Sequence, residues 1–472
     1  MRIAVDTETW PIAPGRLAPR LVCLSWCSGT SSGLLGRDEG LHAARHWLSS
    51  DVELVGVNVA YDMAVLCAAD PTLMPLVWAA YEAGRIFDVA VFEMLRKIAD
   101  GTFQSKPPPT FSMEEIVFEH FGADLTPDKK DPTAWRLRYH ELDGKPLSEW
   151  PAEAVRYAVD DAVWTARLDE KLLSDTFSEA WIDFVPQCRY AWALHLAGCT
   201  GMRTDGVAVD ALEARLRARV DDALPRLVEA GVLAPSRNRA EWEPPLGLDD
   251  HKKSTKELQR RVEADLGEKA PRTEKGGVAY GAEVLFGTSD PILRLYASIS
   301  KDVGELARNI PALKRGADVP LNPRFRVIVA SGRTGVRSKD GDDDPETGAQ
   351  TQNLPRRQGV RECFVARPGK AFVATDLSAA ELVGLAQVCL DLFGWSCLAD
   401  VINAGKDPHK VTAGNMTTAS SLSFTGNINL TSSGTINLSQ AVSATGSLSA
   451  TSSGSFTSGA LTEGTGLSIH TT

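Results

Sequence analysis

The chain has 472 residues, of which 43% are hydrophobic and 24% charged, and its formal net charge is −11 at pH 7. The length allows about two to four domains, and the composition excludes a wholly disordered chain. The negative charge argues against a wholly basic nucleic-acid binder, but it is compatible with an enzyme that holds metal ions in carboxylates and binds phosphates through local basic patches.

The sequence indicates neither a membrane protein nor a secreted one. No uninterrupted apolar run approaches the roughly 18 residues that a membrane-spanning helix needs, so we expect no membrane partner. The N-terminal stretch MRIAVDTET lacks the layout of a signal peptide and leads straight into a predicted strand. We therefore expect a cytoplasmic protein.

Two pairs of residues have spacings that invite a metal-site interpretation. The eight cysteines form no CxxC pair, which favours reduced thiols, and no second pair accompanies Cys23 and Cys27. His42 and His46 have the i, i+4 spacing of a zinc pair, but no third ligand is evident. A half-exposed helix face is the favoured interpretation of the histidines.

The first predicted element is a strand in RIAVDTETW that ends in two acids. Ile3 and Val5 alternate inward, and Asp6 and Glu8 follow at the end of the strand. The two-residue period puts both carboxylates on one face, about 7 Å apart along the strand. The end of a strand is a rigid platform for a metal ion, although many such pairs are solvated strand ends.

The second predicted element is a buried strand followed by a helix, in ELVGVNVAYDMAVL. Asn58 and Asp62 lie four residues apart at this junction, so one helical turn could aim both into the same cleft. The alternative is capping, with Asn58 at the helix start and the Asp62 carboxylate favoured by the helix dipole in the first turn.

The third predicted element is a long helix in PAEAVRYAVDDAVWTARLDEKL, with Pro151 near its start. Tyr157 and Asp161 lie at i and i+4 and so share a face of this helix. The alternative is a tyrosine at the edge of the core beside a solvated aspartate.

Together the three elements form an ordered set, because Asp6, Glu8, Asp62 and Asp161 supply the oxygen ligands that two Mg²⁺ or Mn²⁺ ions require. Two such ions, about 3.5–4 Å apart, can stabilise the attacking and leaving oxygens of a phosphodiester. Tyr157 is placed to orient or deprotonate the water. The set resembles the DEDD-type 3′–5′ exonucleases of the tyrosine subclass. The resemblance implies a ribonuclease H-like α/β fold and the 3′ end of single-stranded DNA as substrate.

Further along, DDHKKSTKELQRRVEADLG contains a predicted helix start at Ser254 or Thr255, preceded by Lys252 and Lys253. Exposed amide groups at a helix N-terminus beside two lysines suit a phosphate backbone. An ordinary basic helix start is the alternative.

The stretches ASGRTGVRS and QTQNLPRRQGVRECFVARPGKAFVATDLSAAEL resemble the start of the palm of family A DNA polymerases, the bacterial polymerase I type. The resemblance covers about residues 1–413 in the order of that family and implies primer–template DNA as a partner. It also implies binding of a deoxynucleoside triphosphate, in an intact homologue only. The residues expected to contact DNA are Asn58, Lys252, Lys253, Arg333, Gln352 and Asn353.

The same resemblance implies a palm motif with Asp376 as a metal-binding catalytic residue and Glu381 as the residue that crowds the sugar's 2′ position. AFVATDL is predicted to be a buried strand that presents Asp376 at its end. Leu377, Ala379 and Ala380 depart from the bulkier residues of the family pattern, which touches packing and nucleotide-pocket detail rather than the carboxylate.

The family's second palm aspartate and its fingers, with a lysine and an aromatic residue for the triphosphate, are expected beyond this point. After Lys410 the sequence contains no Lys, Arg or Asp. We therefore expect a polymerase truncated before its fingers, in which only the 3′–5′ exonuclease survives. A bacterial or phage-infected host fits the resemblance.

From residue 414 the chain is rich in Ser, Thr and Gly and repetitive. The pattern G-x-I-N-L-(T/S) occurs twice, eight residues apart, and TSSG begins at Thr431 and again at Thr451. Alternating apolar residues suit short β-rungs, and the tract resembles bacteriophage tail-fibre or adhesin repeats, so the tail could trimerise. A flexible tail is the alternative.

We therefore predict an α/β exonuclease domain, a mostly helical thumb, a partial α+β palm and a repeat tail. Two alternatives remain. A stand-alone DEDD exoribonuclease is disfavoured because it has no use for the palm motif, and a phage structural fibre fragment predicts trimers without metal-dependent activity. The predicted segments are 1–178, 179–320, 321–413 and 414–472.

Overall fold

The structure is a computed structural model that describes residues 1–104, 110–125, 133–174, 178–235, 251–273, 276–329, 333–336, 351–355, 359–376, 379–408 and short strands between 415 and 471. By its internal contacts the chain divides into two units, Met1–Phe372 and Val373–Thr472, which are described separately. None of the helices in the described ranges combines the length and hydropathy needed to cross a bilayer. The four predicted segment boundaries stay predictions.

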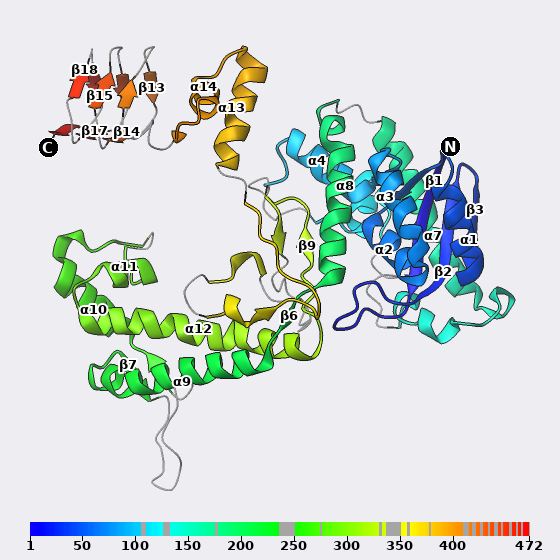
Figure 1. Ribbon diagram of the computed structural model, residues 1–472, viewed down its shortest axis with the longest axis horizontal. Coiled ribbons are helices and arrows are strands. Elements are labelled where there is room, and N and C mark those ends of the chain that lie inside the picture. The colour runs from blue at the N-terminus through cyan, green and yellow to red at the C-terminus, as the bar shows by residue number, and fades with distance from the viewer. Residues whose placement is uncertain are drawn as a thin grey trace, which may run out of the picture. The chain divides into compact units, whose positions relative to one another are not determined.

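The first unit begins with a mixed five-stranded sheet in the order β3-β2-β1-β4-β5 (Figure 1). The strands β1, β2 and β3 are antiparallel neighbours, whereas β4 and β5 run parallel to β1. Ile3, Ala4 and Val5 are all buried, and because side chains alternate along a strand, both faces of β1 must be covered. The bounds are β1 Arg2–Thr9, β2 Leu21–Ser28, β3 Ser31–Gly36, β4 Glu53–Gly56 and β5 Ile86–Asp88.

Helices cover this sheet, with α2 and α7 both packed against β1. One continuous apolar core joins the sheet to these helices. The predicted α/β architecture is therefore confirmed, and the long helix predicted after Pro151 is α7. The helices are α1 Arg37–Leu48, α2 Val59–Ala69, α3 Met74–Glu82, α4 Val89–Ala99, α5 Met113–Phe121, α7 Ala152–Ser174 and α8 Ser178–Thr200, with 3-10 turns at Pro71–Leu73, Trp135–Leu137, Tyr139–Leu142 and Leu147–Glu149.

A mostly helical segment follows, built on the long helices α9 and α12, which pack against each other. Asp205 caps α9 and Asp290 caps α12 through backbone N–H groups. Arg219 of α9 pairs with the buried Asp302 of α12 at 3.1 Å. The elements are α9 Gly206–Glu229, β7 Leu233–Pro235, β8 His251–Lys253, α10 Thr255–Leu266, the 3-10 turn Gly267–Lys269, α11 Ala282–Gly287 and α12 Pro291–Asp318.

Short strand pairs complete the first unit. β6 (Arg203–Thr204) pairs with β11 (Phe364–Val365), and β9 (Phe325–Arg326) pairs with β10 (Gly335–Val336). Two 3-10 turns, Thr351–Asn353 and Arg361–Cys363, lie between β10 and β11.

The buried strand predicted in AFVATDL is not formed. Residues 371–376 have no strand assignment and are exposed, and Phe372 and Val373 are 58% and 86% exposed. The prediction was wrong because a short apolar run becomes a strand only beside a hydrogen-bonding neighbour. The ladders of the described residues include none for this stretch.

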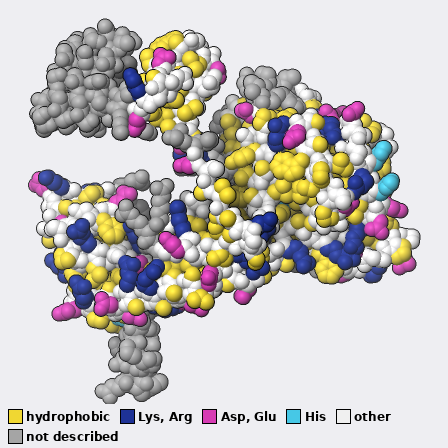
Figure 2. Space-filling view, viewed as in Figure 1, with side chains coloured by type: hydrophobic (Ala, Val, Ile, Leu, Met, Phe, Trp, Pro, Cys, Tyr) yellow, Lys and Arg dark blue, Asp and Glu magenta, His cyan; other side chains and the backbone are white. Residues whose placement is uncertain are grey.

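The second unit contains two helices and a β-coil. The helices α13 (Ala380–Phe393) and α14 (Cys397–Asn403) pack against each other. Hydrophobic side chains lie on the visible face of this pair (Figure 2), and those of Leu392, Phe393 and Trp395 are more than half exposed.

Nine short strands then wind through three parallel sheets, each of three strands, which the chain visits in turn (Figure 1). In this tract the structure describes short strands of the kind predicted as β-rungs. The two TSSG segments lie in register on neighbouring strands, because Thr431 of β14 pairs with Thr451 of β17. The two INL segments, eight residues apart, fall in different sheets. The strands are β12 Asn415–Thr417, β13 Leu422–Phe424, β14 Ile428–Ser432, β15 Thr435–Leu438, β16 Val442–Ala444, β17 Ser447–Ser452, β18 Phe456–Ser458, β19 Leu461–Glu463 and β20 Gly466–Thr471.

Candidate active site

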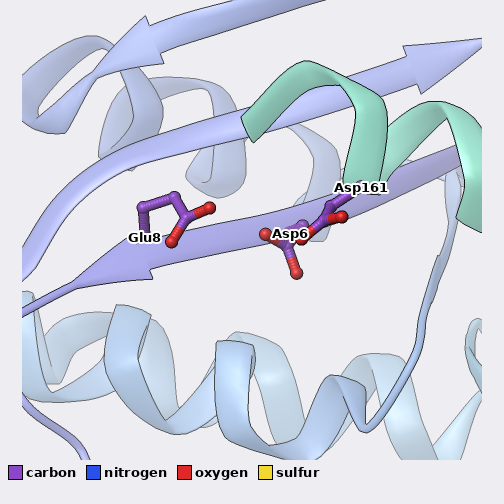
Figure 3. Close-up of side chains that lie close together, drawn as sticks. All are labelled: Asp6, Glu8 and Asp161. Carbon is purple, nitrogen blue, oxygen red and sulfur yellow. The ribbon is translucent and has the colours of Figure 1, made fainter. Parts of the chain in front are cut away.

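Three carboxylates meet where β1 passes α7. Asp6 and Glu8 project from the same face of β1, and Asp161 reaches them from α7 (Figure 3). One ligand oxygen from each residue lies within 4.8 Å of the others. Asp6 is half-buried, whereas Glu8 and Asp161 are buried. Three carboxylates this close repel one another unless protons or cations neutralise them, and their hard oxygens match the ligands that Mg²⁺ and Mn²⁺ prefer.

The charge of this cluster reaches its neighbours. Glu8 lies opposite Cys23 in the β1–β2 ladder. Burial raises the pKa of the Cys23 thiol well above its ordinary value, and the charges of Glu8 and Asp6 raise it further. A bound cation would offset this excess negative charge, which agrees with a metal site.

Asp62, the fourth predicted ligand, lies outside that three-residue group. It is fully buried in the first turn of α2, and its Oδ1 accepts hydrogen bonds from Thr7 N at 2.9 Å and Thr7 Oγ1 at 2.6 Å. Thr7 stands between Asp6 and Glu8, so Asp62 is anchored to the stretch of strand that carries the cluster. Burial raises the pKa of Asp62 to about 7.

Asn58 occupies the N-cap position of α2, but its side chain does not cap the helix. Its backbone adopts a left-handed conformation with a φ of 60°, and its side chain is exposed. Capping falls to Asp88 at the end of β5, whose carboxylate accepts from the backbone N–H groups of Asn58 and Val59, each at 3.1 Å. Sequence reasoning missed Asp88, although an acid between a strand and a helix is a typical N-cap signal.

Tyr157 lies one helical turn before Asp161, on the same face of α7. A cleft of about 280 Å³ opens beside these two residues, and its lining combines aromatic rings with charged groups. The rings are half-buried. Accessible rings beside cations suit a single nucleic-acid strand, whose bases stack and whose phosphates are negative. The lining includes Trp135, Arg138, Glu153, Arg156, Tyr157, Asp160, Asp161 and Trp164.

Besides Asn58, the residues predicted to contact DNA fall in two places of the first unit. Lys252 and Lys253 are exposed on β8, directly before α10, whose N-cap is Ser254 as predicted. Figure 2 shows Lys and Arg side chains on the visible face of the α9–α12 segment.

Arg333 is exposed beside β10, and the Gln352 side chain donates to the neighbouring Thr334 Oγ1 at 2.7 Å. The structure therefore brings Gln352 into contact with Thr334, the residue that follows Arg333. Asn353 belongs to a 3-10 turn, and its side chain lies outside the described residues.

Among the described residues, Asp376 and Glu381 belong to no group of acids close enough to share a metal ion. Both side chains are exposed, Asp376 in an irregular segment and Glu381 in the first turn of α13. Among the described residues, Asp6, Glu8 and Asp161 are the acids found grouped closely enough to share a metal ion. The other predicted pairs behave as ordinary structure, with Cys23 and Cys27 buried in β2 and His42 and His46 exposed on α1.

Comparison with known proteins found a family model that matches the part of the chain that contains the carboxylate cluster. Residues 1–176 match a family model described as 3′–5′ exonuclease. A search of curated proteins found no relative of the chain.

Among solved structures, the chain is similar to the "POL domain of Pol1 from M. smegmatis complex with DNA primer-template and dNTP", with a TM-score of 0.54 and 16% identity. The similarity covers 87% of this chain and 62% of the mycobacterial one, so the chain spans less than two thirds of that protein. Residues 1–176 thus resemble an exonuclease domain, and the fold resembles that of a family A polymerase domain.

Proposed function

We propose that the chain is a divalent-metal-dependent 3′–5′ exonuclease that acts on single-stranded DNA, with its chemistry in residues 1–176. The observation that carries the proposal is the cluster of Asp6, Glu8 and Asp161, within a segment that matches the exonuclease family model. The cleft beside Asp161, which combines aromatic rings with Arg138 and Arg156, supports a nucleic-acid strand as substrate.

Asp6, Glu8 and Asp161 would hold the ions, and Asp62 would supply a fourth carboxylate. The two described hydrogen bonds to Asp62 both end on Oδ1, so coordination through Oδ2 would leave them intact. Two bound ions would stabilise the attacking and leaving oxygens of the phosphodiester. Tyr157, one turn before Asp161, would orient the attacking water or accept its proton.

The test is hydrolysis of a 5′-labelled single-stranded oligonucleotide with Mg²⁺ or Mn²⁺. Changing both Asp6 and Glu8 to Ala should lower the rate by on the order of 100-fold or more, because the ions lose shared ligands. The matched control is Asp38→Ala with Glu39→Ala, two exposed acids in the first turn of α1, which should leave the rate unchanged. Undiminished hydrolysis by the Asp6/Glu8 variant would refute the proposal.

The same assay distinguishes the rival functions. Preferential degradation of an RNA strand of the same sequence would favour a stand-alone exoribonuclease. Absence of hydrolysis, together with trimers in sedimentation analysis, would favour a structural fibre protein.

We further propose that the chain does not extend primers. The exposed, irregular setting of Asp376 and the lack of Asp, Lys and Arg after Lys410 support this proposal, because nucleotidyl transfer needs carboxylates for two ions and a cation on the triphosphate. Primer extension should be undetectable with Mn²⁺, even in the Asp6→Ala, Glu8→Ala background that protects any product. Templated incorporation that disappears on Asp376→Asn would overturn this proposal.

A further inference from the structure

Tyr139 is a buried residue that connects the candidate site to the wall behind it. It opens the 3-10 turn Tyr139–Leu142 and is fully buried in a small apolar cluster that also contains Trp150 and Ala154. Its hydroxyl donates to the backbone carbonyl of Ala154 at 2.7 Å. This buried hydrogen bond ties the first turn of α7 to the 3-10 turn that carries Tyr139.

The ring of Tyr139 also packs directly against Tyr157. Their ring centroids are 6.3 Å apart, and the rings of Trp135 and Trp150 lie 6.2 and 6.0 Å from that of Tyr139. Ala154 and Tyr157 are three residues apart and so lie on the same side of α7. Tyr139 therefore makes two contacts with α7: a hydrogen bond to the backbone one turn before Tyr157 and a ring contact with Tyr157 itself.

The hydroxyl of Tyr139 stays a donor at every working pH. Burial raises its pKa far above the ordinary value, and the charge of Glu8 raises it further. Tyr139 thus lies within electrostatic range of Glu8. Deprotonation of Tyr139 therefore does not remove the hydrogen bond to Ala154.

We propose that Tyr139 is a positioning residue that holds the Tyr157 side chain beside Asp161 for phosphodiester hydrolysis. The inference rests on the proposed exonuclease function. Tyr139 touches neither substrate nor ion in this role and acts through Tyr157. A Phe at position 139 would keep the ring packing but release the first turn of α7.

The test is a double-mutant cycle on hydrolysis of the single-stranded oligonucleotide, with kcat and KM measured for each variant. Tyr139→Phe should lower kcat about three- to tenfold and leave KM nearly unchanged, the size expected for one buried hydrogen bond. In the Tyr157→Phe background the same substitution should have no further effect, because its route to the chemistry is already removed. Tyr81→Phe, at a fully buried tyrosine stacked on Trp192, is the matched control and should leave kcat unchanged.

The outcomes separate the two proposals. An equal loss of kcat on Tyr139→Phe in both backgrounds would show a general structural role and overturn the inference, as would an unchanged kcat. An inactive wild-type chain would instead refute the exonuclease proposal itself. The thermal midpoint of each variant is recorded alongside, and non-additivity with Tyr157→Phe identifies positioning even if Tyr139→Phe lowers that midpoint.

Discussion

Asp88 ties together two helices of the exonuclease domain, and its removal should destabilise both. The carboxylate at the end of β5 accepts from Asn58 N and Val59 N at the start of α2. It also accepts from Ala90 N at 2.9 Å and Val91 N at 3.4 Å at the start of α4. One buried side chain thus satisfies amide groups that two helix N-termini would otherwise leave unpaired.

The expected loss follows from the number of caps. Replacing an N-cap acid by Ala costs about 1–2 kcal/mol, so Asp88→Ala, which removes two buried caps, should lower the free energy of unfolding by about 2–4 kcal/mol. Asp205→Ala is the matched control, because Asp205 is exposed and caps α9 alone, and it should cost about 1 kcal/mol.

The assay is urea unfolding, with hydrogen–deuterium exchange to locate the change. Exchange should quicken in the peptides of α2 and α4 on Asp88→Ala, and in α9 on Asp205→Ala. Equal losses of stability for the two variants, or faster exchange confined to α4, would refute the double-cap argument. Because α2 carries Asp62, the same variant should also weaken the metal dependence of hydrolysis.

The pH dependence of the Asp88 effect has a definite sign. Burial raises the pKa of Asp88 to about 6 in the folded chain, against about 4 when unfolded. The folded state therefore holds the extra proton between these values, and this group lowers stability as pH rises from about 4 to 6, by up to about 3 kcal/mol. Asp88→Asn does not titrate, so its deficit relative to wild type should shrink over that interval. A deficit that grows with pH would contradict the assignment.

Three further outcomes follow from the site and the surface. Added Mn²⁺ should raise the thermal midpoint of the wild-type chain but not of the Asp6→Ala, Glu8→Ala variant, since only the former binds the ion; equal shifts would place the ion elsewhere. Changing Lys252 and Lys253 to Ala should reduce the log–log salt slope of duplex binding by about 1.8, with about 0.9 for each lost phosphate contact, and an unchanged slope would leave both lysines as surface charge. Deleting residues 411–472 should leave oligonucleotide hydrolysis unaltered, because the described ladders of the tail join tail strands to one another; loss of activity in a folded deletion variant would contradict this.

Local sequence patterns predicted the elements of the exonuclease domain because those patterns coincide with its tertiary structure. The alternation around Ile3 and Val5 became β1, and the i, i+4 pair Tyr157 and Asp161 became one face of α7. Asp161 meets Asp6 although 155 residues separate them. The local sequence around either residue does not specify its distant partner. The proximity of Asp6 and Asp161 was predicted instead from the order of the motifs along the chain.

What local reasoning missed depends on neighbours that are distant in sequence. Asp88 caps α2 only because β5 lies beside β4, which no local signal at Asn58 reveals. The contact of Tyr139 with α7 likewise depends on a hydrogen bond to Ala154. The sequence did not specify the path of the turn between these two residues. In the tail, the INL segments eight residues apart are the more obvious sequence repeat, yet the strands pair in the longer register of the TSSG segments. Equivalent strands become neighbours only after the chain has passed through all three sheets.

The stretch around Asp376 shows why a correct motif does not guarantee a formed site. Its short apolar run suits a buried strand, but a strand is stable only when its N–H and C=O groups find partners. The described tail strands pair with one another and supply none. Phe372, Val373 and Leu392 are each more than half exposed. In the exonuclease domain, by contrast, every strand of the sheet has a neighbour and the three carboxylates stand on its central strand and the helix packed against it. This contrast supports the proposal that the hydrolytic chemistry resides in residues 1–176.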